Sequence, residues 1–151
     1  MTHIARTINI AATPSQVFEV LQDLDRLPEL SEMTVEVRNG PGRPIKTGDR
    51  FDQIIKVAGV EIDTEWEVTE VVADSLIRVE GRSKSNGAAS MTEHLHADGT
   101  GCRVELDVDY EPPFGLLGEI ADKVVFESRH EDEAEQILGR LKRLCEAVTA
   151  A

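Results

Sequence analysis

Hydrophobic and polar residues alternate strictly along several stretches of the chain. In Val60–Val72 the clearest run places Ile62, Thr64 and Trp66 on one side and acidic residues on the other. Cys102–Glu111 repeats the pattern, with an apolar or aromatic residue at every second position over most of its length. Because successive side chains of a strand point to opposite faces, both runs predict strands of a sheet with one dry and one solvated face.

Short apolar segments separated by turn residues predict the rest of the sheet. A weakly alternating segment opens the chain, and turns such as Ala58–Gly59 and Asp98–Gly101 divide the later segments. Because these connections are too short for crossover helices, we expect antiparallel hairpins. The predicted strands are His3–Ala12, Met33–Gly40, Arg50–Val57, Val60–Val72, Ser75–Arg82, Ala88–His96 and Cys102–Glu111.

Two short helices are predicted between the first and second strands. Thr13 can cap the first helix, Pro14 suits its first helical position, and Gln16 lies three residues after the cap. The apolar stripe of this helix consists of Val17, Phe18 and Leu21. Pro28 cannot lie inside a continuing helix, so a second short helix is expected to begin near it.

A long helix is predicted at about 114–148, after Pro112 and Pro113. Its apolar residues recur at steps of three and four, and Ser128 and Glu131 interrupt them. The stripe consists of Leu117, Ala121, Val124, Ala134, Leu138, Leu141, Cys145 and Val148. We expect this stripe to pack into the concave side of the sheet. The two polar residues then either face the interior or lie in a solvated charge run, and the second interpretation is favoured.

Length and composition fit one ordinary globular domain over residues 1–151. The sequence is 40% hydrophobic and 30% charged, with a formal net charge of −13. That charge repels phosphate backbones and anionic headgroups, so we expect neither nucleic acid as a partner nor insertion into a membrane. The two cysteines lack metal-site or redox spacing, and no signal peptide is evident, which predicts a cytoplasmic protein with reduced thiols.

Four segments in this order resemble the START-like, or SRPBCC, helix-grip superfamily. The segments are "INIAATPSQVFEVLQDLDRLPEL", "KTGDRF" with Gly48, "DGTGCRVELDVDYEPP" and "ILGRLKRLCE". Within that superfamily the chain is most similar to the polyketide cyclase/dehydrase and lipid transport group. It departs from the group's usual opening pattern at Ala12-Thr13-Pro14, where Ala-Pro-Ala is usual, and at Leu30, where tryptophan is usual.

The resemblance implies an α+β helix-grip fold. In this fold a curved antiparallel sheet of about seven strands wraps a long C-terminal helix, and two short helices follow strand 1. It also implies a deep apolar cavity that holds a hydrophobic molecule such as a lipid, a polyketide or another aromatic or isoprenoid metabolite. We expect no cofactor and no metal, and a monomer or weak homodimer.

The alternation identifies the side chains that are expected to face this cavity. Most of them are apolar, and Glu93 and Tyr110 are the candidates for a catalytic role. The predicted ligand-binding residues are Phe51, Ile62, Thr64, Trp66, Val79, Met91, Glu93, Leu95, Leu106, Val108, Tyr110, Phe114, Leu117, Ala121 and Val124.

Glu93 shares its strand face with the apolar Met91 and Leu95. A carboxyl group there could orient a ligand hydroxyl or act as a general acid or base with a raised pKa. The alternative is a bulged strand, or a position at the solvated end of the cavity, and this alternative is favoured because a buried carboxylate is costly.

Other reactive side chains fit structural roles better. His94 and His96 are expected to point out of the sheet, and His130 is expected on the helix surface. Arg6 and Arg78 could face the cavity but are expected to extend outward from its rim. Cys145 falls on the apolar stripe and predicts a small buried residue.

The sequence therefore predicts a protein that binds a small or medium hydrophobic ligand, as a carrier or accessory protein. One alternative is a polyketide aromatase/cyclase or dehydrase that acts in the same cavity. Another is a protein-interaction helper with a vestigial cavity. Fold alone does not decide among the three.

Overall fold

The computed structural model describes residues 2–57, 59–83, 87–111 and 123–150; the side chains of 123–127 and 149–150 are outside this description. The helical elements are α1 (Pro14–Leu21), η1 (Leu24–Arg26), α2 (Leu27–Leu30) and α4 (Lys123–Ala150). The strands are β1 (Thr2–Ile10), β2 (Thr34–Arg38), β3 (Arg50–Val57), β4 (Val60–Val72), β5 (Leu76–Ser83), β6 (Ala88–Asp98) and β7 (Gly101–Glu111).

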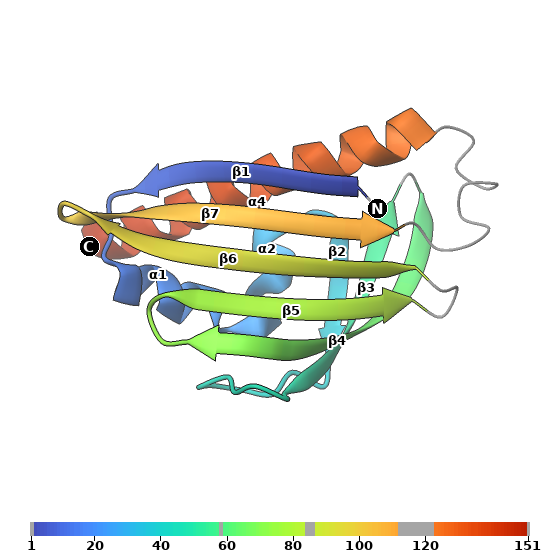
Figure 1. The fold of residues 1–151 in the computed structure, drawn as a ribbon, viewed down its shortest axis with the longest axis horizontal. Helices are drawn as coiled ribbons and strands as arrows, with labels where there is room; N and C mark the ends of the chain where they lie inside the picture. Colours follow the sequence, from blue (N-terminus) through green and yellow to red (C-terminus); the bar gives the residue numbers. More distant parts are fainter. Residues whose placement is uncertain (1, 58, 84–86, 112–122, 151) are drawn as a thin grey trace.

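The strands form one curved, fully antiparallel sheet, as predicted. Its order is β1-β7-β6-β5-β4-β3-β2, so each strand from β2 to β7 pairs with its chain neighbour and β1 pairs with β7. Figure 1 shows α1, α2 and α4 on the same side of the sheet, with α4 running along β1 and β7. This is the predicted helix-grip architecture.

Local sequence signals account for the start of α1. Thr13 Oγ1 accepts a hydrogen bond from the Gln16 backbone N–H, and the Gln16 side chain accepts one from the Thr13 N–H. This reciprocal capping box satisfies backbone donors that would otherwise lack partners at the helix end. It orients α1 so that Val17, Phe18 and Leu21 are buried.

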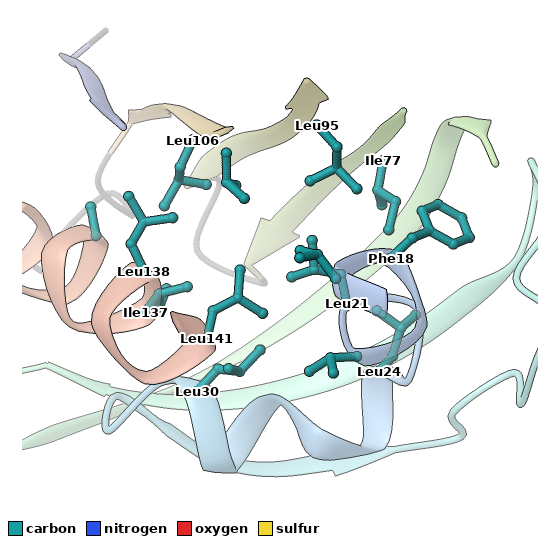
Figure 2. Packing of buried hydrophobic residues seen from close by; sticks show 14 of the residues in the cluster. Phe18, Leu21, Leu24, Leu30, Ile77, Leu95, Leu106, Ile137, Leu138 and Leu141 are labelled. Atoms are coloured by element: carbon teal, nitrogen blue, oxygen red, sulfur yellow. The ribbon is translucent and has the colours of Figure 1, made fainter. Parts of the chain in front are cut away.

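The core lies between the sheet and the helices. Figure 2 shows Leu106 of the sheet near Leu138 of α4, and Leu95 of the sheet near Phe18 of α1. The buried residues of α4 are Ala134, Ile137, Leu138, Leu141 and Cys145. Each large apolar side chain buried in this way stabilises the fold by about 1.5–3 kcal/mol before entropy is subtracted.

The predicted helical stripe is correct in its middle and wrong at its end. Val148 is 67% exposed, because the last turn of α4 passes beyond the apolar surface that the helix covers. Ile137, which the predicted stripe omitted, is buried beside Leu138. Within the described ranges, no helix has the length and apolar content needed to cross a bilayer.

Candidate functional site

An apolar cavity of about 130 Å³ lies between the sheet and the helices. Strands β3 to β7 supply one wall, and the opposite wall comes from the leucines around η1 and α2 and from α4. A water molecule needs roughly 10–15 Å³ of such space, so the cavity has room for several waters or for one small organic molecule.

Nine of the predicted ligand-binding residues line this cavity. Alternation identified them correctly as inward-facing, because the β6 and β7 register keeps one face of the sheet toward the helices. They are Phe51, Ile62, Thr64, Trp66, Val79, Met91, Glu93, Val108 and Tyr110. Their contact with a ligand stays a prediction.

Leu95 and Leu106 do not line the cavity, and that part of the prediction is wrong. Both are buried, at 6% and 1% exposure, in the cluster where α1 and α4 pack against β6 and β7. They point inward as expected, but at the end of the sheet that the helices fill. Of the remaining predicted residues, Phe114, Leu117 and Ala121 lie outside the described residues, as does the side chain of Val124.

Sequence reasoning missed a second set of cavity residues on the helices. His130, Glu133, Ala134 and Ile137 of α4 line the cavity at spacings of three, four and seven residues. That spacing places the four residues on one face of the helix. The sequence therefore contained a signal for this cavity wall, although His130 and Glu133 are polar. The leucines that close the cavity from the other helical segments are Leu21, Leu24, Leu27 and Leu30.

Hydrogen bonds fix one polar part of the wall. Trp66 Nε1 donates to Thr64 Oγ1 at 2.8 Å, and Thr64 Oγ1 donates to the Gln53 carbonyl oxygen at 2.6 Å. Gln53 Nε2 donates to Thr34 Oγ1 at 2.6 Å. Because these groups satisfy one another, the Trp66 ring is held in place with its apolar surface available to the cavity.

Glu93 lies on the cavity side of β6, opposite Ile77 and Leu106 in the register. The bulged strand of the favoured interpretation was wrong, because β6 pairs with both neighbours without a register shift. Burial raises the pKa of Glu93 to about 7, since the charged carboxylate is desolvated. Among the described residues, none donates a hydrogen bond to this carboxyl group.

Glu133 is a second carboxyl group in the same cavity. Burial raises its pKa to about 7, although a hydrogen bond from the Ser31 side chain acts in the opposite direction. Its Oε2 atom is buried and has no hydrogen-bond partner among the described residues. A buried oxygen without a donor costs about 1–3 kcal/mol, more when it is charged, so this position favours a group that brings a donor.

Tyr110 and His130 form a stacked aromatic pair at the cavity. Their ring centroids are 4.3 Å apart and their planes differ by 14°. Tyr110 is 3% exposed, and His130 is only half-buried. The expectation that His130 is a surface residue was therefore wrong, because stacking on Tyr110 draws its ring to the interior side of α4.

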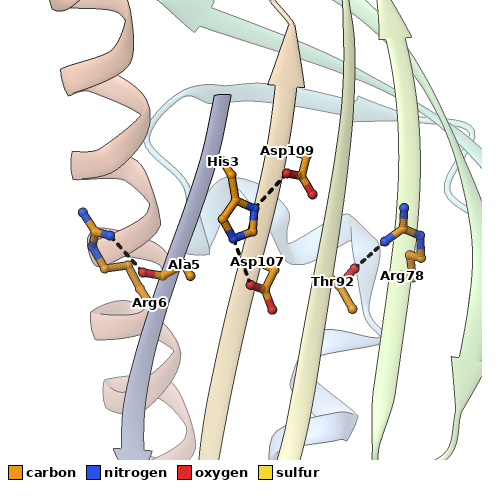
Figure 3. Close-up of polar contacts among 7 residues, drawn as sticks. All are labelled: His3, Ala5, Arg6, Arg78, Thr92, Asp107 and Asp109. Atoms are coloured by element: carbon orange, nitrogen blue, oxygen red, sulfur yellow. Dashed lines mark hydrogen bonds and ion pairs between the residues drawn. The ribbon is translucent and has the colours of Figure 1, made fainter. Parts of the chain in front are cut away.

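The other reactive side chains that the sequence singled out lie away from the cavity. Arg78 donates to Thr92 Oγ1 at 3.0 Å on the outer face, and Arg6 donates to the Ala5 carbonyl oxygen at 2.9 Å (Figure 3). Neither arginine lines the cavity. The exposed or outward-facing residues that match their predicted positions are His94, His96, Ser128 and Glu131.

Cys145 is buried as predicted, and it forms no disulfide with Cys102. Burial raises the pKa of the Cys145 thiol to about 11, so it is protonated at neutral pH. Across the described residues, no cluster of three or more histidines, cysteines or carboxylates has a metal-binding arrangement. Glu93, Glu133, Tyr110 and His130 are polar residues of the cavity wall that can take part in acid–base chemistry and hydrogen bonding.

Comparison with solved structures agrees with the fold. The chain aligns with the Zhui aromatase/cyclase of Streptomyces sp. R1128 at a TM-score of 0.77 and 16% identity, covering 96% of this chain and 93% of that one. Protein CV1439 of Chromobacterium violaceum aligns at 0.74 and 17% identity, with 97% and 99% covered. Ara h 8.0201 aligns at 0.69 and 11% identity, with 97% and 98% covered.

Sequence comparison identifies the family. No curated protein matches the chain. The family described as "Polyketide cyclase / dehydrase and lipid transport" matches residues 1–146, which is nearly the whole sequence. The resemblance of the four sequence segments, the helix-grip architecture and this match agree, and the chain belongs to the polyketide cyclase/dehydrase and lipid transport family.

Proposed function

We propose that this protein binds a small or medium hydrophobic molecule in its internal cavity and acts as a carrier or accessory protein. The observation that carries the proposal is the apolar cavity of about 130 Å³ between the sheet and α4. Apolar walls with a few convergent polar groups are the usual way in which proteins hold small organic molecules. The candidate ligands are lipids, polyketides and other aromatic or isoprenoid metabolites.

The size of the cavity favours a small ligand. An engineered cavity of about 150 Å³ lined by aliphatic and aromatic side chains accepts benzene, whereas drug-sized ligands occupy about 300–1,000 Å³. A cavity of about 130 Å³ therefore accommodates a single ring without rearrangement. A larger ligand has to displace leucines such as Leu27 and Leu30 from the helical wall.

The chain contains a convenient reporter of binding. Trp66 is its single tryptophan, and its ring lines the cavity. We expect an apolar fluorescent probe to bind with a change in Trp66 emission, and lipids or polyketide-like aromatics to displace it. Absence of binding by every probe would refute the carrier proposal and favour the protein-interaction alternative. Trp66→Phe is the control that removes the intrinsic signal and retains the probe's own.

A second candidate function is ring closure or dehydration of a polyketide. It is favoured by Glu93 and Glu133, whose pKa values near 7 suit general acid–base catalysis at neutral pH. An ionised glutamate can remove a proton from a methylene group between two carbonyls. A protonated one, or the Tyr110 hydroxyl, can protonate the oxygen of the carbonyl that is attacked.

This enzymatic alternative has its own test. A poly-β-keto mimic should be converted by the wild-type protein and not by Glu93→Gln or Tyr110→Phe. Mass spectrometry of the product distinguishes a ring closure from a dehydration, because only the dehydration releases water. Binding without turnover in the wild type would exclude the enzymatic role for that substrate and leave the carrier proposal standing.

A further inference from the structure

The cavity presents acceptors without matching donors. Glu93 on β6 and Glu133 on α4 both line it, and the described residues around Glu93 donate nothing to its carboxyl group. The Ser31 side chain bonds the Glu133 carboxyl, but Glu133 Oε2 has no partner among the described residues. An ionised carboxylate only accepts hydrogen bonds, so a complementary ligand has to supply the hydrogens.

Aromatic rings gather in the same space. The chain has one tryptophan and one tyrosine, and both line the cavity together with Phe51. The Phe51 and Trp66 rings stack with centroids 6.3 Å apart, and Tyr110 stacks on His130. The faces of such rings attract cations, most strongly where water is excluded. Carboxylates and aromatic rings around one cavity are a combination that suits a positively charged guest.

Among the described residues that line the cavity, the only arginine or lysine is Arg82, which is exposed. Arg82 and Glu111 are lining residues with opposite charges, and both are exposed. The other titratable groups that face the two buried carboxyls are Tyr110 and His130, which pack against each other. A ligand carboxylate in the interior would thus face two acidic side chains at low dielectric, an arrangement that costs free energy.

From this arrangement we propose that the cavity is selective for hydrophobic amines, whose ammonium group pairs with Glu93 or Glu133 while the apolar body fills the remaining space. The inference rests on the proposed function as a ligand-binding protein. It adds the chemical class of the ligand's polar group. An ammonium supplies three hydrogen-bond donors and no acceptor, which matches the unpartnered oxygens better than a hydroxyl with its single donor.

The test compares three molecules with the same ring and different polar groups: 2-phenylethylamine, 2-phenylethanol and phenylacetate. At pH 8 the amine is protonated, because alkyl ammonium groups such as that of lysine have a pKa of about 10.4. Both glutamates are then mostly ionised. By calorimetric titration of the wild-type protein we expect the amine to bind at least about tenfold more tightly than the alcohol, and phenylacetate to bind weakest.

Variants assign the selectivity to the two carboxyls. Glu93→Gln and Glu133→Gln keep the side-chain size, so we expect each to reduce the preference for the amine over the alcohol, and the double variant to abolish it. Glu36→Gln, on the exposed β2 strand, is the matched control and should keep the wild-type preference. Lowering the pH to 6 should also reduce the preference, because both carboxyls become mostly protonated.

The outcomes separate this inference from the proposed function. Equal affinities for amine and alcohol in the wild type, or a preference that survives in the double variant, would overturn the inference and leave hydrophobic binding intact. Tighter binding of phenylacetate would overturn it as well. Failure of all three molecules and of larger apolar probes to bind would overturn both proposals.

Discussion

At the scale of single residues, Glu93 and Glu133 should make the stability of the fold depend on pH. Both pKa values rise from 4.5 to about 7 on folding, because the cavity desolvates the charged form. Folding therefore favours the protonated carboxyls, and the free energy of unfolding should fall as the pH rises from about 4.5 to about 7. At about 1.4 kcal/mol per pKa unit, the loss is about 3 kcal/mol for each group.

Urea denaturation between pH 5 and pH 8, followed by circular dichroism, measures this effect. Glu93→Gln and Glu133→Gln should each be less pH-dependent than the wild type, and each should be more stable at pH 8. Glu36→Gln is the control, because Arg38 lowers the pKa of that exposed carboxyl and its contribution lies below pH 4.5. A wild-type stability that is flat across this range would contradict the desolvation of both groups.

Gly81 provides a second prediction at the residue scale. A Cβ atom added there would lie 2.4 Å from Trp66 Cδ2 and within 2.6 Å of two further ring atoms. Gly81→Ala therefore has to displace the indole that Thr64 holds. We expect a loss of about 1–3 kcal/mol in the free energy of unfolding, together with a change in Trp66 emission.

Gly139 in α4 is the matched control for this change. The nearest atom to a Cβ added at Gly139 is Arg143 Nη1, at 3.9 Å. Because alanine is the better helix former, Gly139→Ala should stabilise the protein by about 0.5–1 kcal/mol. If Gly81→Ala were neutral and left the emission unchanged, the close approach of Trp66 to β5 would be contradicted.

Sequence patterns predict which way a residue points better than how deep it lies. Alternation placed Glu93 and Leu95 on the inner face, but it carries no information about where along a strand the helices fill the space. Leu95 consequently belongs to the core and Glu93 to the cavity. Glu133 and His130 were missed because polar residues on a helix resemble a solvated face until a partner such as Tyr110 is known.

At the scale of elements, α4 should be sensitive along one side only. Leu141 is fully buried against the sheet, whereas Val148 is 67% exposed. Leu141→Ala should lower the free energy of unfolding by about 2–5 kcal/mol, and Val148→Ala should change it by less than about 0.5 kcal/mol. Thermal or urea unfolding of the two variants measures the difference. Similar losses in both would contradict the orientation of α4.

Strand and turn positions were the most predictable feature of the molecule. Arg50–Val57 and Val60–Val72 were predicted to the residue, because turn residues separate them at Ala58–Gly59 and follow the second at Ala73–Asp74. The first strand was predicted to extend to Ala12, but β1 ends at Ile10. Because Thr13 caps α1, which begins at Pro14, Ala11 and Ala12 form the connection between β1 and α1. The pairing of β2 with β3 contains a register shift between Thr34 and Glu36, and no turn residue in the sequence predicted it.

At the scale of the whole molecule, the cavity is the space left where sheet and helices do not meet. Val108 faces this space from β7 and is half-buried. We expect Val108→Phe to occupy the cavity and weaken binding of an apolar probe by about tenfold. The free energy of unfolding should fall by less than about 1 kcal/mol, because the larger ring enters open space rather than a packed core.

Val72→Phe is the control for this prediction, because Val72 is 50% exposed at the end of β4. It should leave probe binding unchanged. A loss of about 1–3 kcal/mol in Val108→Phe with undiminished binding would mean that the side chain meets packed atoms and that the ligand lies elsewhere.

The pairing of β1 with β7 has a consequence for biosynthesis. His3 finds its partner Asp109 only after 106 further residues have been made. At translation rates of about 5–20 residues per second, the earliest strand waits roughly 5–20 s for its neighbour to be polymerised. During that interval β1 has no partner strand, and its isoleucines remain exposed on the nascent polypeptide. The unpaired strand can then bind a chaperone or associate with another chain and aggregate.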